Sequence, residues 1–490
     1  MKTHTIFFGM LFCVSICGFA QQVIDSTKVQ KLDEVVITDS KFDLKRENSG
    51  KVITKITQKE LQNLQGKTIS EIINTTAGIE INGTKSSASQ NLNYYVRGGR
   101  NRQVLVLIDG VALTDPSQIA NDYDLRLINP DQVESIEILK GASSTLYGSG
   151  AATAVINIKL KKASKEKVSA NLRSTFGTNK SQKDDGLSIN DFRNSVSVNG
   201  TLSKFNYLAS FGNQFTDGLS VISNGTEKDA YNAINGNLKL GFKASSKFKI
   251  NTYMSFDKFK ADFDDAFSMI DTDDVSETLQ YRIGLSPEFK YNNGSLILNA
   301  AYNTIERDIR SSFPTQFKAE SIIADMFNRY NFNDKFFTVV GLNVQESEME
   351  SLTIPFGGTD LEQSIDPKEA SFSIIDPYVN GVYVSDFGLN INTGFRLNNH
   401  SEYGSHLVYS VNPSYRKDFD FGYVKGLVSY STSYITPSLY QLFEPTYGNG
   451  DLKPEENATL ELGAEISLSD KGNFSLVYFK RNEKNFIWKP

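Results

Sequence analysis

Hydrophobic and polar residues alternate with a period of two over most of the chain after about Lys165. The clearest examples are 205–212, 247–256, 296–302 and 460–468, where apolar residues recur at every second position. Successive side chains of a β-strand point to opposite faces, so this period predicts strands with one apolar and one polar face. No amphipathic helix is expected here, and we count about 15 or 16 strands.

The connections between these segments alternate between tight turns and long polar loops. Turn-forming residues occupy 244–246, 291–294 and 469–472, whereas 257–277 and 346–371 are long and acidic. Short turns on one side and long loops on the other are typical of an outer-membrane β-barrel, whose closure pairs every backbone polar group in lipid. A soluble sandwich or solenoid also alternates, but it does not explain the asymmetry.

The region from about Val52 to Leu160 predicts a small α+β domain. Thr57 and Glu60 form a capping-box pattern at the start of a short helix, and a second helix is expected at 68–73. Apolar runs predict strands at 104–108, 133–139 and 154–158. Because a barrel of about 22 strands leaves an open pore, a small domain before it is expected to be a plug.

The N-terminal residues are typical of a secretory signal peptide. A basic start precedes an apolar run at 6–12, and Gly18 and Ala20 supply the small residues that a signal peptidase requires before Gln21. The run is too short to span a bilayer well, so cleavage is favoured over a transmembrane anchor. A lipoprotein site at Cys17 is the less favoured alternative.

Composition narrows the functional classes. The chain has 51 basic and 57 acidic residues and a net charge of -6, which gives no reason to expect nucleic acid as a partner. Both cysteines lie in the predicted signal peptide, and His400 and His406 are the histidines that remain after it. Disulfides, a Cys-ligated metal and a Ser-His-Asp triad are therefore not expected, and we predict no enzyme and no catalytic residues.

Two long motifs in the α+β region resemble the plug of TonB-dependent outer-membrane receptors. The first lies in 95–111 and contains YVRGG and QVLVLIDGV, and the second runs over 133–158 from VESIEILKG to VINI. TPSLYQLF at 436–443 and GNGDLKPE at 448–455 resemble late barrel motifs of the same family. The resemblance covers essentially the whole mature chain, with the motifs in the right order.

The resemblance implies a transmembrane β-barrel of the 22-stranded type with an N-terminal α+β plug domain. The predicted division is 1–20 signal peptide, 21–44 TonB box and periplasmic linker, 45–162 plug domain and 163–490 outer-membrane β-barrel. The late motifs normally precede several more strands, and 486–490 lacks the usual aromatic last residue. We therefore expect a C-terminally incomplete barrel, with an open, C-shaped wall around the plug.

The plug motifs imply structural roles for particular residues. Arg97 enters the plug core and requires a carboxylate partner, for which Glu137 is the candidate. Lys140 stands where the family often has arginine, and lysine lacks the bidentate fork. The glycines are expected at tight turns. The predicted structural set is Arg97, Gly98, Asp109, Gly110, Glu137, Lys140, Gly141, Tyr147 and Gly148.

A β-prone segment just beyond the signal peptide resembles the TonB box of the family. Its residues are Asp33, Glu34, Val35, Val36, Ile37 and Thr38, and no hairpin turn is expected to return a partner strand. An unpaired strand suits strand addition, in which main-chain hydrogen bonds provide the affinity. The resemblance implies that TonB, energised by an inner-membrane complex, pairs with this segment and rearranges the plug; a disordered leader is the alternative.

Within the family, the plug most resembles that of receptors for vitamin B12 (cobalamin). The loops 82–91 and 113–121 are expected to face outward and to form the floor of the ligand site. Their small polar residues suit a corrinoid and equally suit a ferric siderophore. A passive porin or surface adhesin is the alternative of another class, against which the plug and TonB box argue. The candidate ligand-binding residues are Gly83, Ser86, Ser87, Ser89, Gln90, Asn91, Asp115, Ser117 and Asn121.

The same resemblance implies calcium in the extracellular loops, and no other cofactor is expected. Two adjoining loop regions are acidic, and calcium takes several oxygen ligands. The candidate ligands are Asp217, Glu227, Asp229, Asp257, Asp264 and Asp271. A solvated acidic loop is the alternative. The predicted partners are therefore TonB, a corrinoid or siderophore, and outer-membrane lipid.

Overall fold

The computed structural model describes residues 35–84, 88, 91–178, 188–220, 222, 225, 227–265, 267–468 and 472–487. The predicted signal peptide and the first two residues of the predicted TonB box, Asp33 and Glu34, lie outside these residues. So do four of the candidate ligand-binding residues, which are Ser86, Ser87, Ser89 and Gln90.

A five-stranded sheet with the order β3-β8-β9-β6-β7 forms the centre of the plug. Its strands are β3 (Val52–Ile56), β6 (Val104–Ile108), β7 (Val111–Leu113), β8 (Val133–Lys140) and β9 (Ala154–Leu160). β6 and β9 are parallel, and the other neighbours are antiparallel. Two further pairs are small: β1 (Val35–Val36) with β2 (Leu44–Lys45), and β4 (Ile79–Asn82) with β5 (Asn93–Val96).

The plug also contains short helices and 3₁₀ turns. Capping boxes begin α1 and α2, at Thr57 and Thr68, as the sequence predicted for the first of them. Ile72, Ile73 and Ile138 are completely buried or nearly so in the resulting core. The helices are α1 (Gln58–Asn63), α2 (Ile69–Ile73) and α3 (Ser144–Tyr147), with 3₁₀ turns η1 (Arg46–Asn48), η2 (Asn101–Gln103), η3 (Leu125–Leu127) and η4 (Pro130–Gln132).

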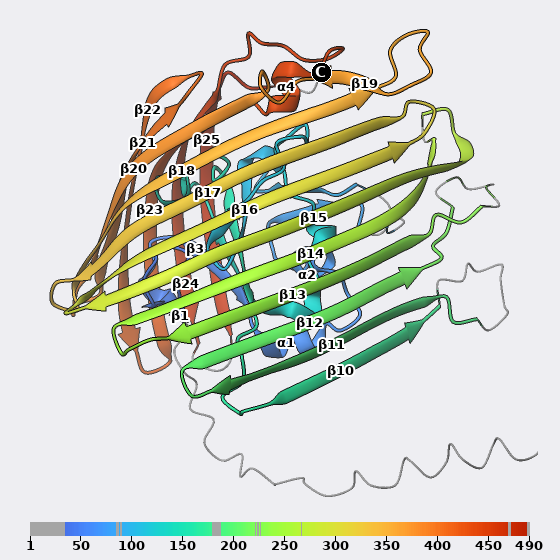
Figure 1. The fold of residues 1–490 in the computed structure, drawn as a ribbon. Helices are drawn as coiled ribbons and strands as arrows, with labels where there is room; N and C mark the ends of the chain where they lie inside the picture. Colours follow the sequence, from blue (N-terminus) through green and yellow to red (C-terminus); the bar gives the residue numbers. More distant parts are fainter. Residues whose placement is uncertain are drawn as a thin grey trace, which may run out of the picture. The chain divides into compact units, whose positions relative to one another are not determined.

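A 16-stranded antiparallel sheet follows the plug and forms the wall (Figure 1). Sequential strands are neighbours, except that the short β19 pairs with β18 off the main path. The strands are β10 (Ser169–Gly177), β11 (Asp191–Leu202), β12 (Phe205–Thr216), β13 (Tyr231–Lys243), β14 (Phe248–Asp265), β15 (Ile270–Tyr291), β16 (Gly294–Arg310), β17 (Thr315–Asn331), β18 (Phe336–Thr353), β19 (Glu362–Ile365), β20 (Ser371–Val384), β21 (Leu389–His400), β22 (Gly404–Phe419), β23 (Gly422–Ile435), β24 (Glu455–Ser467) and β25 (Asn473–Lys484).

The wall strands alternate as predicted. On β24, Leu460 and Leu462 are exposed, whereas Thr459 and Glu461 are buried. The outer face is therefore apolar and suits lipid, and the inner face is polar and meets the plug. Within the described residues, β10 and β25 each pair with one neighbour only, so the wall is an open sheet, as expected.

Two expectations about the wall are wrong. The segments 257–277 and 346–371 are not simply long loops, because β14, β15 and β18 continue far into them. Many of the acidic residues in these segments lie on paired β-strands. The hydrogen bonds between the strands of each hairpin continue into regions where the side chains are polar and meet water. A helix also occurs in the wall region, the five-residue α4 (Leu439–Phe443), capped by Ser438. Among the described residues, no helix is both long and apolar enough to cross a membrane.

Candidate functional site

The first described residues form a short hairpin rather than an unpaired strand. Val35 and Val36 of β1 pair with Lys45 and Leu44 of β2. The chain turns between them, where the Lys41 amide donates to the Ile37 carbonyl at 2.8 Å and Lys41 adopts a φ of 59°. The expectation that no turn returns a partner strand is therefore wrong, because this turn uses a lysine rather than a glycine signal.

Glu137 of β8 holds this hairpin on the plug. Its Oε2 accepts hydrogen bonds from the Ile37 amide at 3.1 Å, the Thr38 amide at 3.2 Å and the Thr38 hydroxyl at 2.7 Å. Lys159 pairs with the same carboxylate at 2.5 Å. Burial favours a higher pKa for Glu137, but Lys159 and these hydrogen bonds outweigh it and lower the pKa. Tyr147 adds a hydrogen bond to the Thr38 carbonyl at 2.8 Å, so Thr38 is fixed from two sides.

Arg97 pairs with the wall and not with Glu137. Arg97 and Gly98 have φ values of 50° and 74° and form a tight turn between Val96 and Gly99. This turn directs the guanidinium to Glu461 of β24, with which it forms an ion pair. The predicted Arg97–Glu137 pair is therefore wrong. The reason is that Arg97 lies in a turn rather than in a strand, so its side chain leaves the plug.

The other predicted structural residues lie at turns or at the contact with the wall. Asp109 and Gly110 form the two-residue turn between β6 and β7, with φ values of 50° and 84°. Gly141 has a φ of 96°, and a Cβ there would lie 2.7 Å from Glu461 Oε1. Lys140 donates to the Ala77 carbonyl at 2.6 Å, and burial together with Arg97 lowers its pKa to about 8.

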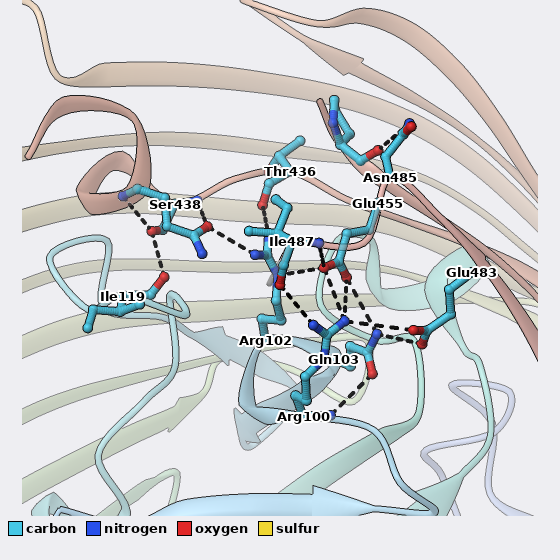
Figure 2. Close-up of polar contacts among 12 residues, drawn as sticks. Arg100, Arg102, Gln103, Ile119, Thr436, Ser438, Glu455, Glu483, Asn485 and Ile487 are labelled. Atoms are coloured by element: carbon cyan, nitrogen blue, oxygen red, sulfur yellow. Dashed lines mark hydrogen bonds and ion pairs between the residues drawn. The ribbon is translucent and has the colours of Figure 1, made fainter. Parts of the chain in front are cut away.

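A cluster of buried charges joins the plug to the end of the wall (Figure 2). Glu455, at the start of β24, pairs with Arg100 at 3.1 Å and with Arg102 at 3.7 Å. Gln103 donates to Glu483 of β25 at 2.9 Å. Because Glu455 is 1% exposed, its two arginines are needed to offset the cost of burying its charge.

The predicted ligand loop 113–121 is held in place from the wall. Asp115 accepts hydrogen bonds from the amide and hydroxyl of Ser117 at 3.0 and 2.6 Å. Arg307 of β16 pairs with Asp115 at 3.3 Å and donates to the Ser117 hydroxyl at 3.0 Å. Ser438 donates to the Ile119 carbonyl at 2.9 Å, and Asn121 takes a φ of 54° at the end of the loop.

The structure describes only part of the other predicted ligand loop, 82–91. Gly83 has a φ of 92° and begins the loop. Asn91 accepts a hydrogen bond from Arg126 at 3.1 Å. These two residues therefore border loop 82–91, and loop 113–121 supplies the better-defined part of the candidate ligand site.

Four of the six candidate calcium ligands lie together. Carboxylate oxygens of Glu227, Asp229 and Asp264 lie within 4.8 Å of one another. Asp271 joins them, since it accepts from the Glu227 amide at 3.3 Å, and the Ser220 hydroxyl reaches both Asp264 and Asp271 at 3.2 Å. Burial and the neighbouring carboxylates raise the pKa of Glu227 to about 7. Carboxylate oxygens crowded in this way suit a divalent cation.

The two remaining candidate calcium ligands have other surroundings. Asp217 pairs with Lys228 at 2.5 Å. Asp257 is buried on β14, nearer the middle of that strand than Asp264. Neither residue belongs to the carboxylate group that the structure brings together.

The wall residues that contact the plug were not identified from the sequence. Glu461, Glu455 and Arg307 stand on the polar faces of alternating strands, which indicates that they point inward. Nothing local indicates which plug residue each one meets, because the partners are separated by 192 to 364 residues. Ser438 carried a local signal, since it begins a capping box with Gln441, but the short helix was not anticipated.

Comparison with family models assigns both parts of the chain. Residues 45–155 match the TonB-dependent receptor plug domain, and residues 187–487 match the TonB-dependent receptor-like β-barrel. The vitamin B12 transporter BtuB of Vibrio cholerae is 24% identical over 459 residues, which cover 90% of this chain and 68% of that protein. BtuB of Photobacterium profundum is 23% identical over 436 residues, covering 88% and 66%.

Solved structures share the fold at lower identity. The siderophore receptor PirA of Acinetobacter baumannii superimposes with a TM-score of 0.70 at 19% identity, covering 90% of this chain and 71% of that one. The ferric enterobactin receptor PfeA of Pseudomonas aeruginosa gives a TM-score of 0.72 at 18% identity, covering 88% and 72%. These values support the fold and do not define a ligand.

Proposed function

This chain belongs to the family of TonB-dependent receptors, and we propose that it imports a large, scarce nutrient, with a corrinoid such as vitamin B12 as its ligand. Receptors of this family are outer-membrane transport proteins of Gram-negative bacteria. The corrinoid assignment rests on the similarity to vitamin B12 transporters over 90% of the chain. Removal of residues 1–20 by a signal peptidase is part of the same proposal.

The docked hairpin is the observation that supports energised transport. The TonB protein would pair with 33–38 by strand addition, and main-chain hydrogen bonds to it would replace those that Val35, Ile37 and Thr38 now form with Lys55 and Glu137. A pull on this segment acts first on Thr38, which Glu137 and Tyr147 hold. Force would therefore enter the plug sheet through β8 and α3, and the plug would rearrange to admit the ligand.

We propose that the clustered carboxylates Glu227, Asp229, Asp264 and Asp271 hold calcium. The first two lie between β12 and β13, and the other two lie at the facing ends of β14 and β15. One ion shared among them would bind neighbouring strand connections together and fix that side of the ligand site.

Calorimetric titration of cyanocobalamin into the purified receptor, with calcium and then with a chelator, tests both proposals. We expect binding in calcium and weaker binding in chelator. Asp264→Asn should remove the effect of calcium, whereas Asp217→Asn, a matched control outside the carboxylate group, should preserve it. Absence of cyanocobalamin binding in calcium would refute the corrinoid assignment.

A ferric siderophore is the second candidate ligand, because solved siderophore receptors share this fold with TM-scores of 0.70 and 0.72. Calorimetry with iron-loaded siderophores under the same conditions separates the two candidates. A siderophore that binds while cyanocobalamin does not would reassign the ligand and leave the TonB-dependent mechanism unchanged.

A further inference from the structure

The plug loop 113–124 faces the side of the wall that carries the long strand connections. Arg307, which holds this loop, stands close to the end of β16 at Arg310. Ser438, which also holds it, begins α4 in the connection between β23 and β24. A ligand that enters from this side therefore meets this loop and the neighbouring residues 100–103 as its floor.

Each of five arginines on and around this floor is paired with a carboxylate. Arg307 pairs with Asp115 at 3.3 Å, and Arg126 pairs with Asp124 at 2.7 Å. Arg100 and Arg102 share Glu455, and Arg481 pairs with Glu483 at 2.6 Å. The apex charge group comprises Arg100, Arg102, Arg126, Arg307, Arg481, Asp115, Asp122, Asp124, Glu455 and Glu483.

The arginines are thus engaged before any ligand arrives. The five arginines of the apex charge group pair with four carboxylates, and Asp122 adds a fifth, so the ten side chains together carry no net positive charge. An anionic ligand would have to compete with a carboxylate for each guanidinium. Breaking such a half-buried pair leaves its other member without a partner, which opposes anion binding.

The side-chain hydrogen bond that Asp122 accepts comes from a neutral amide and not from an arginine. Asp122 Oδ2 accepts it from the Asn101 amide at 2.9 Å. Burial raises its pKa to about 6, and the charges of Asp115 and Asp124 act in the same direction. At neutral pH this carboxylate is therefore mainly ionised, and the charges of Asp115 and Asp124 act on it.

We infer that this floor selects ligands without net negative charge, and that Asp122 is the residue that sets this selectivity. A corrinoid without charge or a cationic ferric hydroxamate satisfies the condition. A triply negative ferric tris-catecholate does not, because each arginine of the apex charge group is already paired with a carboxylate and Asp122 offsets the remaining positive charge. The inference rests on the proposed function, since it requires that a ligand reach this floor.

The experiment compares three probes on the purified receptor in calcium: cyanocobalamin, which is neutral, ferrioxamine B, which is cationic, and ferric enterobactin, which is triply negative. We expect at least one of the first two to bind at least about tenfold more tightly than ferric enterobactin. Asp122→Asn should reduce this ratio about tenfold by strengthening ferric enterobactin binding.

The matched control is Glu348→Gln, which removes one charge from the exposed outer face of β18. It should leave the ratio unchanged, and both variants should retain the thermal unfolding temperature of the parent. A merely structural role for Asp122 would weaken all probes together and would not change their ratio.

Two results overturn the inference: ferric enterobactin binding as tightly as the better of the other two probes, or an unchanged ratio in Asp122→Asn. Failure of the corrinoid assignment is distinguishable from both. If ferrioxamine B binds while cyanocobalamin and ferric enterobactin do not, the ligand is not a corrinoid and the charge selectivity stands.

Discussion

Gly148 occupies a point where the plug backbone touches the inner wall. Its φ and ψ of 80° and −152° lie in a region that residues with a Cβ rarely adopt. A Cβ at this position would lie 2.7 Å from an Arg396 guanidinium nitrogen. Arg396 is itself almost fully buried and pairs with Asp376 at 2.8 Å, so it has little room to move. The absence of one side chain therefore permits this contact.

Gly148→Ala should destabilise the seating of the plug. The backbone strain costs about 1–3 kcal/mol, and displacement of Arg396 adds to it. We expect a lower thermal unfolding temperature and faster proteolysis of the plug. Gly450→Ala is the matched control, because no atom lies within 4 Å of its Cβ position and its φ is not positive. Equal stability of the two variants would contradict this explanation.

The titration of the Asp122 side chain predicts that the binding of anionic ligands depends on pH. Its pKa is raised to about 6, and the groups around it are Asn101, Asp115 and Asp124. As the pH falls through 6 the carboxyl gains a proton and loses its negative charge. Ferric enterobactin should therefore bind more tightly at pH 5.5 than at pH 7.5 when compared with a neutral probe. In Asp122→Asn the ratio between the two probes should be the same at both pH values.

At the scale of elements, the hairpin of β1 and β2 is too short to be stable alone. It has two residue pairs, and an isolated two-stranded hairpin is marginal even when it is longer. Its position therefore depends on contacts with β3, β8 and α3, chiefly the three hydrogen bonds to Glu137 and one from Lys55 to the Val35 carbonyl. Availability of the predicted TonB box is therefore set by these contacts rather than by the strand itself.

Glu137→Gln should release the hairpin from the plug. The change removes the charge that Lys159 and Thr38 share, and hydrogen bonds to charged groups contribute about 1.5–3 kcal/mol each. A spin label on Val35→Cys should become more mobile in this variant. Glu134→Gln, at a half-buried position of the same strand that pairs with Lys162, is the control and should leave the label immobilised. An immobile label in both variants would assign the anchoring to other residues.

Local signals in the sequence predicted elements well and their long-range partners badly. Thr57 and Glu60 identified α1 because a capping box is complete within four residues. The period of two identified the wall, because alternation follows from strand geometry. The ion pair of Arg97 was assigned wrongly, since its partner Glu461 lies 364 residues away and the turn at Arg97 has no strong local signature. Extended pairing of 257–277 was missed because polar strands resemble loops.

At the scale of the whole described molecule, the segment that follows the predicted TonB box ties the plug to the wall. Lys41 pairs with Asp325 of β17 at 2.6 Å and donates to the Tyr378 hydroxyl of β20 at 2.6 Å. Its ammonium also lies 4.4 Å from the centre of the Phe327 ring. Burial lowers the pKa of Lys41, and Asp325 opposes this effect. Burying this ion pair costs free energy of folding, and removing only one of its two charges costs more.

A double-mutant cycle tests this tie. Lys41→Met leaves Asp325 buried without its cation, and Asp325→Asn leaves Lys41 without its anion, so each single change should cost about 3–5 kcal/mol. The double variant removes both charges and keeps an amide for the Tyr378 hydroxyl, which donates to Asp325 at 2.8 Å. It should therefore cost less than the sum of the two single changes.

The cycle is measured by urea titration of a spin label on Asp43→Cys, an exposed position in the same segment. Release of the label at lower urea in each single variant than in the double variant would show that the charges act as a pair. Additive effects would show instead that Lys41 and Asp325 are held independently, by their aromatic and polar neighbours. In that case a pull on the predicted TonB box would not be opposed by this pair, and Glu137 would remain the principal anchor between the hairpin and the plug.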